Sequence, residues 1–242
     1  EKYPIGRNIR KLKTFEESFE HASSDTASQM FFLAHERFDK ILYYDDENIK
    51  RGREMIMERG LNIYIHCSYN LNICDSKRYI AECVKRQLTY AKRLYTRGVV
   101  IHVGKHCCVD NVEDGLRNSV KNILECLEST SVNCPLLLET PSSQGTETLT
   151  DMNDFLNFVD SINDERFGMC LDSCHVFASG YEPSEYLGEI IKRGMLNRLK
   201  LVHLNDSCDP KGSRLDSHSF IGTGYMELGE VHKFIHMCYE NG

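Results

Sequence analysis

The chain has 242 residues, with 29 Lys and Arg against 36 Asp and Glu, and a formal net charge of −7. Its hydrophobic fraction of 41% is typical of a globular protein, and no apolar run approaches the ~20 residues of a membrane-spanning helix. No signal peptide is recognisable at the start, which is Glu1. This length suits one barrel-type domain, and we expect residues 1–242 to form it.

The cysteines indicate the cellular setting. There are eleven, an odd number without regular spacing, and Cys83, Cys126 and Cys170 lie inside helix or strand patterns. An unpaired Cys in such a pattern packs as a small hydrophobic side chain. We therefore expect an intracellular, reducing compartment, and leave cytoplasm, nucleus and viral factory as alternatives.

The negative charge argues against a nucleic-acid partner, but only weakly. If some of the acids hold cations, three divalent ions would add six positive charges and nearly neutralise the sum. The charge therefore leaves the partner open.

Short β-type runs alternate with amphipathic helical patterns along the chain. The predicted strands are Tyr3–Ile9, Gln29–Leu33, Asn62–His66, Val99–His102, Leu136–Glu139, Phe167–Asp172 and Lys200–Leu204. The predicted helices are Thr14–Ala22, Asp46–Arg59, Ser76–Thr96, Val109–Ser129, Leu149–Ser161, Pro183–Asn197 and Glu227–Glu240. Gly60 and Gly98 are predicted to cap helix ends, and Pro183 to open a helix.

The alternation predicts a (β/α)₈ TIM barrel, with a doubly wound open sheet as the alternative. Only seven strands are recognisable, and Asn241-Gly242 resembles the turn before an eighth. A barrel lacking one strand would keep two open edges. We therefore expect the eighth strand to be missing from this chain through truncation at the C-terminus.

Metal-ligand side chains end five successive predicted strands. These residues are His66, His102, Glu139, Asp172 and His203. The spacings of 36, 37, 33 and 31 residues each match one β-α unit. Equivalent strand ends meet at the C-terminal mouth of a barrel, where active sites lie. A single such His is usually structural, but five in phase predict a metal centre, and this mixture suits Zn²⁺ or Mn²⁺ better than Mg²⁺ or Ca²⁺.

Three further polar groups lie close to these strand ends in the sequence. His175 follows Asp172 by three residues, so Asp172 is either a ligand or the N-cap of a helix that has His175 in its first turn. Asp216 and His218 share one side of an extended segment and could complete a further metal site with His175. The alternative for that segment is a solvated loop, and Gly222-Thr223-Gly224 is interpreted as a bend.

Two longer strings resemble signatures of the endonuclease IV family of apurinic/apyrimidinic endonucleases. One is Cys170-Leu171-Asp172-Ser173-Cys174-His175-Val176-Phe177-Ala178-Ser179-Gly180-Tyr181. The other is His203-Leu204-Asn205-Asp206-Ser207, followed by Gly212–His218 and Ile221–Gly224. The run Leu136–Thr140 with Gln144-Gly145, His66 with Tyr69, and His102 also fall where the family's motifs would be.

The resemblance implies a barrel with three Zn²⁺ ions, with Mn²⁺ as an alternative at one site. His66, His102 and Glu139 would hold the first ion; Glu139, Asp172 and His203 the second; and His175, Asp216 and His218 the third. Glu139, His102 and Asp172 are predicted to be catalytic. The family also uses a glutamate at the end of the eighth strand, which this chain lacks.

The implied activity is hydrolysis of the phosphodiester 5′ to an abasic site in double-stranded DNA, a step of base excision repair. The products are a 3′-hydroxyl and a 5′-deoxyribose phosphate. Predicted DNA contacts are Arg37, Tyr69, Lys105 and Lys211. The protein is expected to act as a monomer, away from membranes.

Two other functions remain open. Related barrels include sugar isomerases and epimerases, which also gather Glu, Asp and His at strand ends but use two metals or fewer. The separate group formed by His175, Asp216 and His218 argues against that function. A barrel that binds DNA without cutting it is the third possibility.

Overall fold

The computed structural model describes residues 5–9, 12–20, 28–32 and 44–241, with 28–32 described by their backbone alone. Six parallel strands form one sheet, in the order in which they follow along the chain. They are β1 (Ser28–Phe32), β2 (Asn62–His66), β3 (Gly98–Ile101), β4 (Leu136–Glu139), β5 (Phe167–Asp172) and β6 (Leu199–His203). Neighbours in the sequence are thus neighbours in the sheet, as in a barrel wound in one direction.

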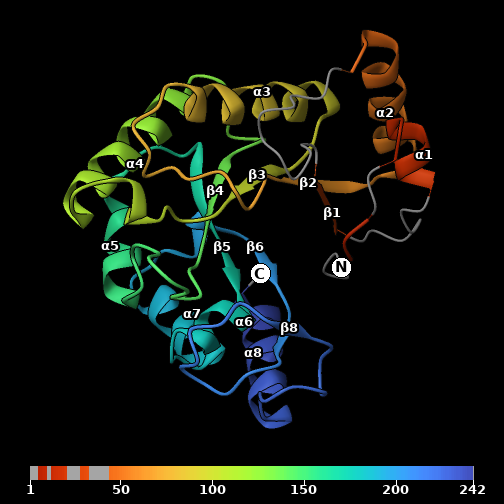
Figure 1. Cartoon of the computed structure of the whole chain (residues 1–242). Coiled ribbons are helices and arrows are strands. Elements are labelled where there is room, and N and C mark those ends of the chain that lie inside the picture. The colour runs from red at the N-terminus through yellow and green to blue at the C-terminus, as the bar shows by residue number, and fades with distance from the viewer. Residues whose placement is uncertain (1–4, 10–11, 21–27, 33–43, 242) are drawn as a thin grey trace.

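Helices connect successive strands and lie on the outer side of the sheet (Figure 1). They are α2 (Asp46–Arg59), α3 (Tyr79–Leu94), α4 (Val112–Leu127) and α5 (Met152–Ser161), with α6 (Ser173–Ala178) and α7 (Pro183–Lys192) between β5 and β6. The predicted TIM-barrel fold is confirmed, and the described residues supply six strands of such a barrel. The doubly wound alternative is wrong, because that fold does not keep its strands in sequence order.

The remaining elements lie at the two ends of the described chain and after β6. Helix α1 (Phe15–Glu20) precedes β1, and α8 (Leu228–Asn241) follows a small antiparallel pair, β7 (Asp206–Ser207) and β8 (His218–Ser219). Two 3₁₀ turns cover His106–Cys108 and Leu196–Arg198. None of the helices in the described ranges is both long enough and apolar enough to cross a membrane.

The predicted strand Tyr3–Ile9 is wrong over its described part. Residues 5–9 form no strand, and Ile5 is 72% exposed. A segment becomes a strand only when it is paired and packed, and residues 5–8 are exposed. The rest of that prediction, residues 3 and 4, lies outside the described residues.

The predicted helix-end residues Gly60 and Pro183 lie at helix ends in the structure, whereas Gly98 does not. Asp45 caps α2 by accepting a hydrogen bond from the Asn48 backbone, and Gly60 ends the helix with φ of 63°. Pro183 opens α7 as predicted. Gly98, however, does not cap α3, since Tyr95 adopts the left-handed conformation there with φ of 62°.

The two faces of the sheet bury different side chains. Outward-facing residues such as Ile63, Ile101 and Leu138 belong to the core shared with the helices. A smaller cluster on the barrel side contains Val100, Leu137 and Cys170, with Tyr64 and Leu201 packed against it. Because strand side chains alternate, the residue two positions further along each strand also faces the barrel interior.

Candidate metal centre

The residues two positions beyond this inner apolar layer are the predicted metal ligands. They are His66, His102, Glu139, Asp172 and His203. The structure brings these five side chains together as a second layer above the apolar one, in the manner of the stacked layers of barrels. The alternation that buries the apolar layer therefore also aims the ligands into the mouth.

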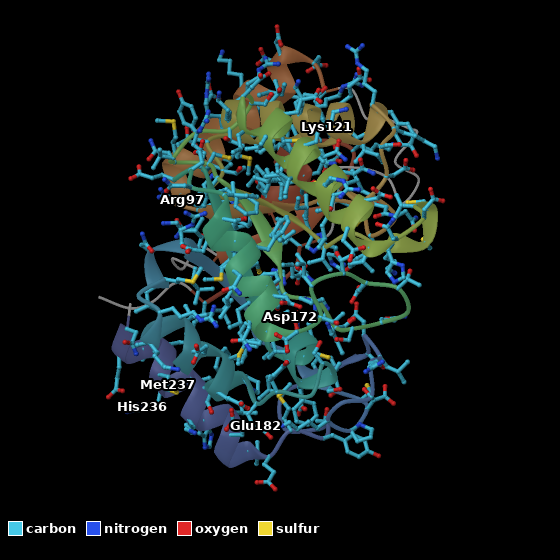
Figure 2. All side chains as sticks on the ribbon, turned by 90° about the vertical axis from the view of Figure 1, so that its left-hand side faces the viewer. Arg97, Lys121, Asp172, Glu182, His236 and Met237 are labelled. Carbon is cyan, nitrogen blue, oxygen red and sulfur yellow. The ribbon has the colours of Figure 1, made fainter. Side chains whose placement is uncertain are left out.

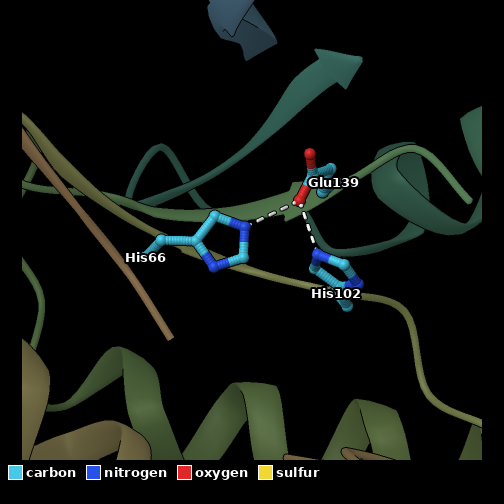
Figure 3. A group of neighbouring side chains, drawn as sticks. All are labelled: His66, His102 and Glu139. Atoms are coloured by element: carbon cyan, nitrogen blue, oxygen red, sulfur yellow. Dashed lines mark hydrogen bonds and ion pairs between the residues drawn. The ribbon is translucent and has the colours of Figure 1, made fainter. Parts of the chain in front are cut away.

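Glu139, the last residue of β4, lies at the middle of this group and is 2% exposed. Its Oε2 lies 3.0 Å from Nε2 of His66 and 3.0 Å from Nε2 of His102, so two strands present imidazoles to one oxygen (Figure 3). Its Oε1 lies 2.6 Å from Nδ1 of His203. Each carboxylate oxygen therefore faces different imidazoles, so Glu139 would be available to two cations.

The surroundings of Glu139 favour the ionised form of its carboxyl group. Burial raises the pKa of Glu139, but the facing His203 and His102 imidazoles outweigh it and hold the pKa well below its usual range. Burial lowers the pKa of His66 and thereby favours its neutral ring.

His66 supplies a test of whether a cation fits. Its Nδ1 lies 2.6 Å from the carbonyl oxygen of Cys67, which fixes the proton on Nδ1 because a carbonyl only accepts. In the neutral ring, Nε2 then points a lone pair at Oε2 of Glu139. These two ligand atoms lie 3.0 Å apart, a separation at which one divalent cation would bind both.

Asp172 caps a helix, and its position also suits the ligand role considered from the sequence. Its Oδ1 accepts a hydrogen bond of 3.0 Å from the backbone of His175 and so caps α6. Its Oδ2 accepts from the Asn205 amide at 2.7 Å and lies 3.6 Å from Nδ1 of His203. The side chain is fully buried and lies near the middle of the molecule (Figure 2). One oxygen shapes the helix, and the other faces the site.

A second group lies beside the first. Oδ1 of Asp216 is 3.2 Å from Nε2 of His175 and 3.1 Å from Nε2 of His218. His175 is 3% exposed, and its Nδ1–H donates to the carbonyl oxygen of Thr140 at 2.8 Å, which turns Nε2 toward Asp216. Burial lowers the pKa of His175, but the carboxylates of Asp172, Asp216 and Glu139 outweigh it and raise the pKa well above its usual range. Although burial raises the pKa of Asp216, the two imidazoles lower it below its usual range.

Two buried ring nitrogens have no hydrogen-bond partner, Nε2 of His175 and Nε2 of His203. Buried polar atoms nearly always have partners, so such atoms indicate a missing ligand. Separations of 3.0 to 3.2 Å between ligand atoms of the two carboxylate-centred groups also approach the about 3.3 Å expected between two ligands of one tetrahedral zinc. The residues therefore fit bound metal.

The grouping of ligands agrees with the predicted sets in part. His66, His102 and Glu139 form one group whose ligand atoms lie within 4.8 Å of one another, and so do His175, Asp216 and His218. The predicted second set was Glu139, Asp172 and His203. In the structure, Glu139 instead forms one compact group with Cys170 and His203 and another with Asp172 and His175. Asp172 and His203 are thus adjacent, but they do not form a compact triad with Glu139.

Sequence patterns did not reveal three neighbours of these ligands. Asn205 and Thr140 hold Asp172 through hydrogen bonds to its carboxylate and its backbone, and Cys170 lies directly beneath the site. Thr140 directly follows Glu139, and Asn205 lies two residues after His203. Their role depends on contacts more than thirty residues away, which spacing does not show.

Of the predicted DNA contacts in the described residues, Tyr69 borders the candidate ligands, whereas Lys105 and Lys211 make other contacts. Tyr69 is 59% exposed, and its ring centre lies 5.3 Å from that of His66 and 5.1 Å from that of His102, so it borders the mouth. Lys105 is half-buried, and its backbone bonds with Asn72. Lys211 is ion-paired with Glu182 at 2.8 Å. Arg37 lies outside the described residues.

Comparisons with known proteins agree with this geometry. A protein of Staphylococcus aureus (strain JH9) named "Probable endonuclease 4" is 28% identical over 203 residues, which cover 79% of this chain and 68% of that protein. The crystal structure of endonuclease IV from Thermus thermophilus superposes with a TM-score of 0.78 at 22% identity, covering 95% of this chain and 87% of that one.

The fold alone does not distinguish nucleases from sugar epimerases. A D-tagatose 3-epimerase-like protein superposes with a TM-score of 0.70 at 19% identity, over 98% of this chain and 88% of that one. The family model described as xylose isomerase-like TIM barrel matches residues 25–239. The chain belongs to the xylose isomerase-like TIM barrel family, and its resemblance to endonuclease IV is confirmed.

Proposed function

We propose that this protein is a zinc-dependent endonuclease of base excision repair. It would hydrolyse the phosphodiester 5′ to an abasic site in duplex DNA and leave a 3′-hydroxyl and a 5′-deoxyribose phosphate. The observation that carries this proposal is the juxtaposition of two ligand groups, one centred on Glu139 and one on Asp216. Because related sugar epimerases are expected to use two metals or fewer, the separate group centred on Asp216 favours the endonuclease.

The donor atoms favour zinc. Imidazole nitrogens outnumber carboxylates around the mouth, and that mixture suits Zn²⁺ better than the oxygen-preferring Mg²⁺ or Ca²⁺. His66, His102 and Glu139 would hold one ion, and His175, Asp216 and His218 another. The third would lie between Glu139, Asp172 and His203. We expect Mn²⁺ to replace zinc at one site at most.

The chemistry divides between the ions and the chain. Bound zinc ions supply activated water at neutral pH and positive charge for the attacked phosphate and the departing 3′-oxygen. Glu139 supplies a buried carboxylate whose pKa is held well below its usual range and which faces imidazoles with both oxygens. The hydrogen bonds from Asn205 and the α6 backbone fix Asp172, so its free oxygen side stays turned to the mouth. His102, 15% exposed, lies between this buried set and solvent.

The DNA would lie across the mouth and be held mainly by its backbone. Tyr69 would contact a nucleotide that has left the stack; its exposed ring beside His66 and His102 supports this role. Lys105 and Arg37 are proposed as phosphate contacts. Lys211 would have to exchange its ion pair with Glu182 for a phosphate. An abasic nucleotide is inexpensive to extrude because it has no base to unstack.

The cellular setting is proposed from the cysteines. All eleven are free, and most of them are buried in the core. Such thiols support a reducing, intracellular compartment, in which exposed Cys107, Cys108 and Cys208 also stay reduced.

A labelled duplex with one abasic-site analogue tests the proposal. We expect a single incision 5′ to the lesion, a product that a DNA polymerase can extend, and loss of cleavage with a chelator. The same duplex with an intact base is the control and should stay uncut. Epimerisation of a ketose by a sample that leaves the abasic duplex intact would replace this proposal with the sugar-epimerase function.

A further inference from the structure

Asp206 is a fully buried carboxylate that belongs to none of the candidate metal groups of the described residues. It begins β7, three residues after His203. Its two oxygens accept four backbone hydrogen bonds. Oδ1 accepts from Ser207 at 2.8 Å and from Met226 at 3.0 Å, and Oδ2 accepts from Gly222 and Gly224, each at 3.0 Å. Both oxygens are thus used to hold the 222–226 turn.

The turn leaves no room for a side chain at position 224, which is a glycine. A Cβ there would lie 2.3 Å from the carbonyl oxygen of Ser207 and 2.3 Å from Oγ of Ser219. The backbone N–H of Tyr225 also donates to the carbonyl oxygen of Ser207, at 2.8 Å. The 222–226 turn therefore packs directly against both strands of the small antiparallel pair.

That pair carries a predicted metal ligand. In the ladder, Asp206 pairs with Ser219 and Ser207 pairs with His218, and the N–H of Cys208 donates to the carbonyl oxygen of Ser217 at 2.8 Å. A two-residue antiparallel pair is marginal by itself in water. His218 is 42% exposed, so its own burial does little to fix it. The contacts that fix its backbone are those with β7 and the turn.

An ionised carboxylate suits this role. Burial raises the pKa of Asp206, but the four backbone N–H groups lower it below its usual range. Charge-assisted hydrogen bonds are stronger than neutral ones, so one side chain can tie separate backbone segments together.

We propose that Asp206 is a positioning residue for the third metal site: it holds the 222–226 turn against β7 and β8 and thereby keeps His218 beside Asp216 and His175. It contacts no ligand atom of that site itself. The inference rests on the proposed function only for the identity of the metal.

The substitution Asp206→Asn tests this role in the full chain. The amide keeps the shape but replaces one acceptor oxygen with a donor group that faces backbone donors. We expect the variant to fold and to bind two zinc ions as wild type does. Its affinity for the third should be about 10–100-fold weaker, as for other supports of metal ligands. Excess zinc should restore the nicking rate. Asp160→Asn, on the exposed side of α5, is the matched control and should bind as wild type.

Zinc stoichiometry at limiting metal separates positioning from simple structural support. If Asp206→Asn melts earlier yet keeps all three ions at wild-type affinity, the inference is wrong. Should that variant fail to fold, Gly222→Ala is the milder test, because it keeps Asp206 but strains a residue with φ of 80°. It should weaken the same single ion, and unchanged affinity would again overturn the inference. Wild type that binds three ions but nicks no abasic duplex would remove the proposed function and leave this role of Asp206 intact.

Discussion

At the scale of single residues, the ligands differ in how firmly their surroundings hold them. His66 and His175 each have Nδ1 bonded to a backbone carbonyl, so the orientation of their Nε2 atoms is fixed before any ion arrives. His218 is half-exposed, and its ring is directed by Asp216 at 3.1 Å. The site thus combines rigid ligands inside the barrel with one held by a surface turn.

The first prediction concerns His175, whose Nε2 is buried without a hydrogen-bond partner. We expect His175→Ala to fold, to lose one zinc ion and to nick abasic DNA at least about 100-fold more slowly, the scale on which removing one charge-stabilising group acts. His236→Ala, an exposed position of α8 (Figure 2), is the control. Wild-type nicking by the His175 variant would exclude this residue from the mechanism.

The second prediction concerns the pH dependence of stability. The pKa of Asp206 is below its unfolded value, so its contribution is present above about pH 4 and is lost as the pH falls through the folded pKa. We therefore expect Asp206→Asn to be less stable than wild type at pH 7, and the difference to shrink toward pH 3. Urea unfolding of metal-free samples at several pH values measures it. A difference independent of pH would show that the charge of Asp206 contributes nothing.

The spacing of strand ends is sufficient to predict five of the candidate ligands. Asp216 and His218 are ambiguous in the sequence, because an exposed segment with two polar residues is usually a solvated loop. Their proposed role as metal ligands depends on contact with His175, about forty residues away, and on the support that we propose for Asp206. The interpretation of Gly222-Thr223-Gly224 as a bend overlooked its purpose, since the sequence does not reveal the carboxylate it surrounds.

At the scale of elements, the two-residue alternation in the strands does most of the positioning. The same pattern buries Val100, Leu137 and Cys170 in the barrel and places a candidate ligand two residues further along each strand. Where β5 meets β6 the register shifts between Met169 and Cys170, and His203 still pairs with Asp172. The contact between these two strands therefore controls the middle of the site.

The third prediction tests that contact through Gly168 in β5. A Cβ at Gly168 would lie 2.6 Å from the carbonyl oxygen of Arg198, a backbone atom that cannot turn aside. We expect Gly168→Ala to destabilise the protein by about 1–3 kcal/mol, as other overpacked sites do. Gly229→Ala, with nothing within 4 Å of its added Cβ, should change stability by about 1 kcal/mol or less. Equal effects of the two substitutions in urea unfolding would contradict this account of the β5–β6 contact.

Sequence patterns identified the six parallel strands to within one or two residues, because buried parallel strands are strongly apolar. They failed at residues 5–9, of which 5–8 are exposed and only Ile9 is buried. They also assigned a cap to Gly98, which lies inside β3, where a Cβ would be 3.1 Å from the Leu137 side chain. Both errors come from contacts across the fold, which local composition cannot report.

At the scale of the whole molecule, the negative net charge is compatible with a DNA substrate because of where the acids lie. The net charge of −7 would oppose DNA if it were spread evenly, but several of the acids lie inside the mouth among imidazoles. Bound divalent cations would reverse the local sign where the phosphate must lie. The overall charge alone could not have predicted this, since it depends on which acids the fold brings together.

The most direct test of the central claim is a zinc titration of metal-free protein. Bound ions are counted by native mass spectrometry, and incision of an abasic duplex is measured in the same samples. We predict that three ions bind and that incision approaches its full rate only as the third site fills. Full incision by protein that holds no metal, or three bound ions with no incision at any occupancy, would contradict the account.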